Sequence, residues 1–244
     1  MIQVYFSWNV KQKADKKSDF SFFLEQFLVK LKDLFCTSRP MTYVPEELID
    51  QIEALKSEGK FEEALKVVNS ILAKDPTNEE WLLQIVDIHY QQKEITKADK
   101  AIDFLNTRKE NDPMGLYIKG VLEMEKNHRD EARKILKKAI EITDGTNHEI
   151  IRCYALSEYW YGNREKGMSN LKTAFKMNNK DAELIFNIIQ IDILEKIYDE
   201  ANDMIQHFFA HKSELETIEK PLEWYEKKIT LLNKALQKEK TMAQ

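Results

Sequence analysis

Two histidines four residues apart, His207 and His211, are the side chains in this sequence best spaced to do chemistry. Residues four apart share one face of a helix, so both imidazoles could coordinate a single divalent metal ion. A metal site needs further ligands, and the nearby sequence offers only Glu214, which is loosely placed. We therefore interpret both histidines as ordinary polar positions and predict neither a metal site nor a cofactor.

Other catalytic patterns are missing from the sequence. It contains no glycine-rich phosphate loop, nucleophile elbow or zinc-finger spacing. The two cysteines, Cys36 and Cys153, lie far apart and match neither a disulfide framework nor a metal motif, which favours free thiols in a reducing compartment. Acidic residues are so numerous that no catalytic pair stands out. These observations predict that the protein is not an enzyme.

Charge is distributed unevenly along the chain, whose formal net charge is −5. Residues 1–40 carry seven Lys/Arg and four Asp/Glu, a balance of +3, so the remaining residues carry −8. Binding to phosphate backbones needs a basic face, so an acidic main body argues against a nucleic-acid partner. A protein or peptide partner is the expectation.

Composition predicts a helical, water-soluble chain. Only six glycines and five prolines occur in 244 residues, too few for the turns of a β-sandwich or barrel. The most apolar stretch, residues 20–35, contains four charged residues and is shorter than the roughly 20 apolar residues of a membrane span. No targeting segment is convincing, so we expect a cytoplasmic protein.

A small residue recurs along the chain every 34 or 35 residues, at Ala64, Ala98, Ala132, Gly167 and Ala201. Such a period marks a stack of identical supersecondary units. Each small residue follows a short turn between two stretches of helical spacing, and we interpret its size as the condition that lets the two helices touch. Overfilling such a site costs about 1–3 kcal/mol.

The period also divides the chain. We predict an N-terminal extension over 1–44 with an amphipathic helix at about 18–36, and a C-terminal capping helix and tail over 216–244. Between them lie five two-helix repeats over 45–215, namely 45–78, 79–112, 113–147, 148–181 and 182–215. The turns inside the repeats are predicted near Gly59, Lys93, Asn127, Gly162 and Lys196.

These residues resemble the tetratricopeptide repeat family, whose 34-residue unit is a helix-turn-helix with small residues at positions 8 and 20. The third repeat fits best, with Leu116, Gly120, Ala132, Leu136 and Ala139 in place. The family resemblance implies an all-α, right-handed α-solenoid of about five repeats. Positions 8 of the other repeats depart from the pattern at Ile52, Val86 and Ile189.

The resemblance also implies that a ligand lies in a concave groove lined by the first helix of each repeat. Here that groove is aromatic and aliphatic with one arginine, which favours an apolar helix or peptide carrying an acidic group for Arg152. Burial of the same residues against neighbouring repeats or the N-terminal helix is the alternative. The predicted groove residues are Leu83, Tyr90, Tyr117, Val121, Met124, Arg152, Tyr159, Trp160, Phe186, Gln190 and Ile193.

The N-terminal segment leaves three interpretations open. Its apolar face can pack on the repeats, over the first repeat or within the groove; residues 18–36 can contact a membrane; or the segment can be a non-native extension. Packing on the repeats is favoured, because acidic and basic residues balance on the helix and weaken attraction to anionic lipid.

The sequence therefore predicts a scaffold or adaptor that binds a helix or peptide of a partner in the concave groove. The alternative is a structural subunit of a larger complex, membrane-associated or self-associating, that uses the convex face and the N-terminal helix. Neither the partner nor the oligomeric state follows from the sequence.

Overall fold

The computed structural model describes residues 46–217 and 221–242, where regular structure is helical apart from one isolated bridge between Asp181 and Glu216. The predicted N-terminal extension and its helix at 18–36 lie outside the described residues. Five helix pairs follow one another: α4 (Glu46–Ser57) with α5 (Phe61–Leu72), α6 (Glu79–Gln91) with α7 (Ile95–Arg108), α8 (Pro113–Glu125) with α9 (Arg129–Ile142), α10 (His148–Tyr161) with α11 (Arg164–Met177), and α12 (Ala182–Leu194) with α13 (Tyr198–Ala210). A short 3-10 helix, η3 (Lys212–Glu214), and a long helix, α14 (Leu222–Met242), complete the chain.

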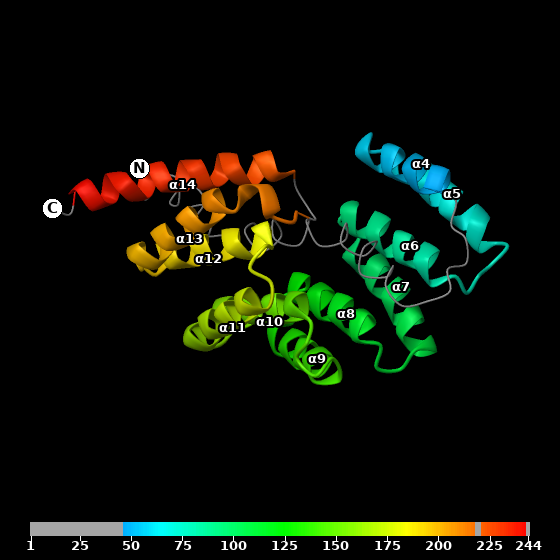
Figure 1. Ribbon diagram of the computed structural model, residues 1–244. Helices are drawn as coiled ribbons and strands as arrows, with labels where there is room; N and C mark the ends of the chain where they lie inside the picture. Colours follow the sequence, from blue (N-terminus) through cyan, green and yellow to red (C-terminus); the bar gives the residue numbers. More distant parts are fainter. Residues whose placement is uncertain (1–45, 218–220, 243–244) are drawn as a thin grey trace.

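The helix pairs stack along an arc, so the all-α solenoid that the repeat spacing predicts is confirmed (Figure 1). The first helices α6, α8 and α10 lie on the inner side of this arc, and their partners α7, α9 and α11 lie on the outer side. Each pair buries the small residue predicted for it: Ala64, Ala98, Ala132, Gly167 and Ala201 are all buried.

Two glycines show why the small residues are needed. A Cβ atom on Gly167 would lie 2.6 Å from the backbone nitrogen of Tyr159 and 2.8 Å from the carbonyl oxygen of Ala155. A Cβ atom on Gly120 would lie 2.7 Å from Cγ of Leu136. Real Cβ atoms do not approach this closely, so the helices of these two repeats touch only because the side chain is absent.

The turn inside most repeats places one residue in the left-handed region. Gly59, Lys93, Asn127 and Lys196 have φ angles of 73°, 61°, 63° and 62°. These are the predicted turn positions, spaced at the repeat period. Glycine adopts this conformation at little cost, whereas lysine does not.

The first helices of the second to fifth repeats share a cap that the sequence analysis did not identify. The side chains of Asn78, Asp112, Asn147 and Asp181 each accept a hydrogen bond from a backbone N–H in the first turn of α6, α8, α10 and α12. These four residues repeat with spacings of 34, 35 and 34. Each cap satisfies an N–H group that the helix itself leaves without a partner, which fixes where each first helix begins.

Helix α14 closes the C-terminal end of the stack, as predicted from its apolar stripe. It begins directly after Pro221 and buries Tyr225, Ile229 and Leu236 against α12 and α13. The ring of Phe186 on α12 lies 5.9 Å from that of Tyr225 in an edge-on arrangement. Because α14 covers the last repeat, the apolar end of the solenoid is not left in solvent.

Among residues 46–217 and 221–242, no helix combines the length and apolarity needed to span a bilayer.

Candidate interaction surface on the first helices

The first helices α6, α8, α10 and α12 are buried on more sides than the outer helices. Every residue of α10 from Glu149 to Tyr159 is buried, and so is every residue of α12 from Ala182 to Ile193 except Gln190. The outer helices bury only one face, as Ala132, Leu136 and Ala139 do in α9. A helix whose full circumference is buried needs neighbours all around it.

The predicted groove residues lie on these first helices, and we call them together the inner surface (residues 83, 90, 117, 121, 124, 152, 159, 160, 186, 190 and 193). All of them are buried except Trp160 and Gln190, which are half-buried. The inner surface is thus not open to solvent in the full chain. Whether it binds a partner stays a prediction.

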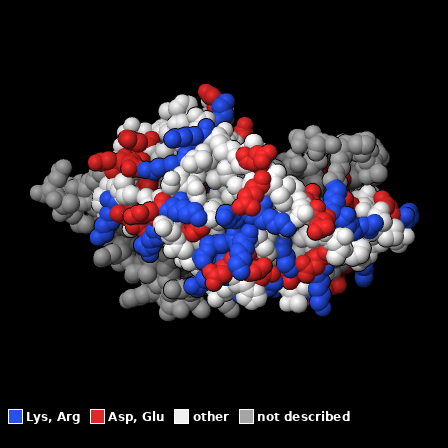
Figure 2. Space-filling view, turned by 90° about the horizontal axis from the view of Figure 1, so that it is seen from below, with Lys and Arg blue, Asp and Glu red and all other residues white. Residues whose placement is uncertain are grey.

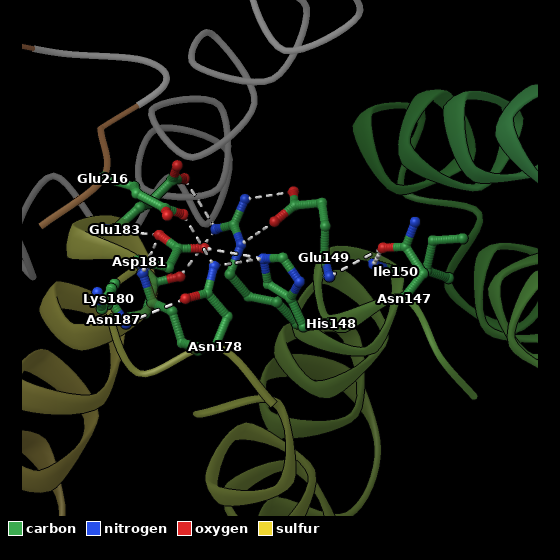
Figure 3. Close-up of polar contacts among 12 residues, drawn as sticks. Asn147, His148, Glu149, Ile150, Asn178, Lys180, Asp181, Glu183, Asn187 and Glu216 are labelled. Atoms are coloured by element: carbon green, nitrogen blue, oxygen red, sulfur yellow. Dashed lines mark hydrogen bonds and ion pairs between the residues drawn. The ribbon is translucent and has the colours of Figure 1, made fainter. Parts of the chain in front are cut away.

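Arg152 lies in a buried cluster with Glu149, Glu183 and Asn187, three residues that Figure 3 labels. The Nε atom of Arg152 donates to Glu149 Oε2 at 2.7 Å, and Nη2 donates to Glu149 Oε1 at 2.6 Å. The Nη1 atom lies 2.8 Å from Glu183 Oε1 and donates to Asn187 Oδ1 at 3.0 Å. All four side chains are at most 2% exposed. Burial opposes the charged guanidinium, yet Glu149 and Glu183 hold the pKa of Arg152 well above its ordinary value.

Figure 3 shows that these groups come from neighbouring repeats. Glu149 extends from α10, whereas Glu183 and Asn187 extend from α12, so the cluster joins the fourth repeat to the fifth. The hydroxyl of Tyr117 on α8 also donates to Glu149 Oε1, which adds the third repeat. Burial, together with the nearby Cys153 and Glu149, raises the pKa of the Tyr117 phenol.

A second cluster has the same arrangement in the first two repeats. Lys56 on α4 donates to Glu53 Oε1 at 2.8 Å and pairs with Asp87 on α6. In both clusters a cation pairs with the acid three residues before it and with an acid 31 residues after it, on the next first helix. Each cation is therefore shared by two carboxylates, so acids outnumber bases in both clusters.

Tyrosine–carboxylate hydrogen bonds connect further first helices. The hydroxyl of Tyr90 on α6 donates to Glu125 on α8 at 2.9 Å, and that of Tyr159 on α10 donates to Glu195, which follows α12, at 2.6 Å. Hydrogen bonds to charged acceptors are stronger than neutral ones. These links hold neighbouring repeats in register along the inner surface.

His207 and His211 each lie against a backbone carbonyl oxygen. His207 Nε2 lies 3.0 Å from the carbonyl oxygen of Asn179, and His211 Nδ1 lies 3.0 Å from that of His207. The two rings stack with centroids 4.4 Å apart. Among the described residues, no three potential ligands gather into a site for a metal ion.

Comparison with known proteins leads to the same architecture. The sequence model of the tetratricopeptide repeat family matches residues 55–122. Residues 55–122 are thus similar to the tetratricopeptide repeat family. A tetratricopeptide repeat protein from Parabacteroides merdae is 19% identical, with 94% of this chain and 85% of that one covered and a TM-score of 0.58. No curated protein matches the chain.

Other solved tetratricopeptide repeat structures are similar at the same level. A thermophilic repeat protein of Thermus thermophilus is 16% identical, covering 78% of this chain and 98% of that one, with a TM-score of 0.60. PilW, a type IV pilus biogenesis factor, is 15% identical, covering 72% and 81%, with a TM-score of 0.59. At these identities the likeness is one of fold. The tetratricopeptide repeat architecture supports a protein-interaction scaffold in general.

Proposed function

We propose that this protein is a non-enzymatic, cytoplasmic scaffold that binds an amphipathic helix or peptide of a partner protein along its inner surface. The observation that carries the proposal is the chemistry of that surface. It combines aromatic and aliphatic side chains from four successive first helices with two clusters in which acids outnumber bases. Aromatic residues and arginine are the usual energetic anchors of protein interfaces.

The ion pairs that Arg152 already makes indicate which charge the bound segment carries. The sequence alone favours an acidic group on the ligand to meet this arginine. In the structure Glu149 and Glu183 already hold its guanidinium, so an acidic ligand would meet two carboxylates. We therefore propose that the bound segment is apolar on one face and basic beside it, because electrostatic complementarity favours the opposite sign.

A second candidate function rests on the outer helices. One large apolar side chain is exposed near the end of each of α7, α9, α11 and α13, namely Phe104, Ile142, Met177 and Phe209, with exposures of 48%, 39%, 41% and 39%. Exposed apolar side chains of this kind occur at subunit contacts. They favour the alternative of a structural subunit that assembles through its convex face.

The charged residues of the outer helices favour neither an acidic nor a basic partner. Figure 2 views the molecule from below, where α9 and α11 lie in Figure 1, and shows Lys/Arg interspersed with Asp/Glu over this side. Ion pairs such as Lys134–Glu131 at 3.8 Å and Lys137–Glu141 at 3.6 Å are exposed. A mixed, solvated surface of this kind contributes little to binding.

Affinity purification with quantitative mass spectrometry separates the two functions. The pair of variants is Trp160→Ala on the inner surface and Ile142→Ala on the outer side, each checked for an unchanged helical circular-dichroism spectrum. Trp160 is preferred over Tyr117 because it is only half-buried. The proposal expects the amount of co-purified partner protein to fall at least fivefold with Trp160→Ala. It expects that amount to stay unchanged with Ile142→Ala. The reverse pattern would establish the convex-face alternative instead.

A further inference from the structure

Most residues of the inner surface are buried, although no described helix lies on the side that faces the hollow of the arc. Helix α10 packs against α11 and α9 behind it and α8 beside it, and the cluster around Arg152 joins it to α12 on the other flank. Its remaining side faces the hollow of the arc (Figure 1). Yet the eleven consecutive residues from Glu149 to Tyr159 are all buried, and eleven residues make about three full turns of helix. The four described neighbours of α10 do not by themselves account for burial on this side.

The covering segment must match an apolar surface with an acidic excess. Val121, Leu156 and Phe186 are buried and apolar, and Glu149 with Glu183 outnumber Arg152. A matching segment has a continuous apolar face and basic residues beside it.

We infer that residues 18–36 of the same chain lie along the inner surface of α8, α10 and α12 as an amphipathic helix. In this segment a single face of a helix collects eight large apolar residues: Phe20, Phe23, Leu24, Phe27, Leu28, Leu31, Leu34 and Phe35. Residues 18–36 themselves carry two Lys and three Asp/Glu, so the complementary positive charge comes from Lys11, Lys13, Lys16 and Lys17 just before them.

Length and connection fit the same arrangement. A helix of these 19 residues is about 28 Å long, and three neighbouring first helices spaced by about 10 Å span roughly 20–30 Å. The nine residues 37–45 that lead to α4 can extend to about 30 Å, enough to bring the segment from the first repeat to the third.

This inference concerns the chain alone and does not depend on the proposed function. Its consequence for that function is competition: a partner's helix and residues 18–36 cannot occupy the inner surface together. A bound partner then has to displace the segment, and the affinity observed for the full chain is lower than the intrinsic affinity of the surface.

Photo-crosslinking of the full chain tests the placement directly. Phe27, in the apolar stripe, is replaced by p-benzoylphenylalanine, and Gln26, on the other side of the same helix, is replaced in a control. Irradiation followed by peptide mass spectrometry is expected to give adducts with α8, α10 and α12 from position 27 and few from position 26. A mixture of ¹⁵N-labelled and unlabelled chains separates adducts within one molecule from adducts between molecules. Adducts between molecules, with lipid, with α4–α5 or with α14, or no adduct at all, would overturn the inference.

Thiol reactivity gives a second, independent measurement. Cys153 on α10 is 6% exposed, and its Sγ atom lies 3.5 Å from the Tyr117 hydroxyl. In a Cys36→Ser background, the double change Phe23→Glu and Phe27→Glu is expected to raise the alkylation rate of Cys153 at least tenfold, whereas Gln26→Glu leaves it unchanged. The rates are compared only between variants with the same helical content. An unchanged rate in a folded double variant overturns the inference.

Discussion

The guanidinium of Arg152 on α10 lies 2.8 Å from the carboxylate of Glu183 on α12, and neither side chain reaches solvent. This ion pair crosses from one repeat to the next, and Glu149 completes it from the same helix as Arg152. Removing one partner from a buried pair leaves the other charge buried without compensation, which costs more than the pair contributes when intact.

Replacing Arg152 by Met is expected to lower the free energy of unfolding by about 3–5 kcal/mol, since two buried carboxylates then share no cation. The double variant Arg152→Met with Glu183→Leu is expected to recover part of this loss, because it removes one of those carboxylates together with the cation. Urea denaturation of the two variants and the wild type measures both effects. A loss below about 1 kcal/mol for Arg152→Met would show that solvent reaches the cluster.

Gly167→Ala tests the close approach of the two helices in the fourth repeat. The added methyl group would meet backbone atoms of Tyr159 and Ala155, which cannot rotate away. We expect the melting temperature to fall, with a destabilisation of about 1–3 kcal/mol despite the better helix propensity of alanine. Ser169→Ala, at an exposed position of the same helix, is the matched control and should change stability by no more than about 0.5 kcal/mol. Equal melting curves for the two variants would contradict the repeat packing.

Lys196→Gly is expected to stabilise the protein. Lys196 is exposed and holds a φ of 62° in the turn between α12 and α13, where a side chain is strained and glycine is not. The expected gain is about 0.5–1 kcal/mol, the left-handed strain minus the entropy that glycine loses on folding. Lys196→Ala removes the same charge but keeps the Cβ atom, so it should give no gain. A similar gain in stability for both variants would show that the effect comes from removing the charge of Lys196.

Asp192 makes stability depend on pH. The pKa of the Asp192 carboxyl is raised to about 7. Burial is the main cause and the nearby Glu200 on α13 adds to it, whereas Lys172 on α11 lowers the pKa. The folded state therefore holds a proton that the unfolded state releases between about pH 4 and pH 7, so the free energy of unfolding falls as the pH rises through that window.

The neutral variant Asp192→Asn isolates this contribution. Relative to the wild type, it is expected to gain stability at pH 8 and to lose most of that gain at pH 5, as measured by urea denaturation at both values. Asp203→Asn, at an exposed position of α13, serves as the control. A stability difference for Asp192→Asn that is the same at pH 5 and pH 8 would rule out a proton held in the fold.

The sequence predicted the local features of this fold because they depend on short spacings. Ala98 and Ala132 are buried at the repeat period, and the turns at Gly59 and Asn127 stand where the helical pattern breaks. Helix α14 begins after Pro221, where its apolar stripe starts. Each of these follows from a helix, a turn or a small side chain read along one stretch of chain.

Features that depend on contacts between repeats were harder to predict. Glu149, Arg152 and Glu183 form one such pattern. The cation follows the first acid by three residues, and the second acid follows the first acid by 34. Acid–cation pairs at the same short spacing also occur on solvated helices, as in Glu131 and Lys134, so the pattern alone does not mark burial. The Asx caps, by contrast, recur at the repeat period, and a search for capping residues at that interval would have found them.

In-cell photo-crosslinking at one inner and one outer position tests the central claim most directly. p-Benzoylphenylalanine at Trp160 probes the inner surface, and at Ile142 it probes the convex side, in full chains of equal abundance. We predict that position 160 forms adducts with another protein while position 142 does not. Adducts with another protein at position 142 and none at position 160 would contradict the claim that this protein binds through its inner surface.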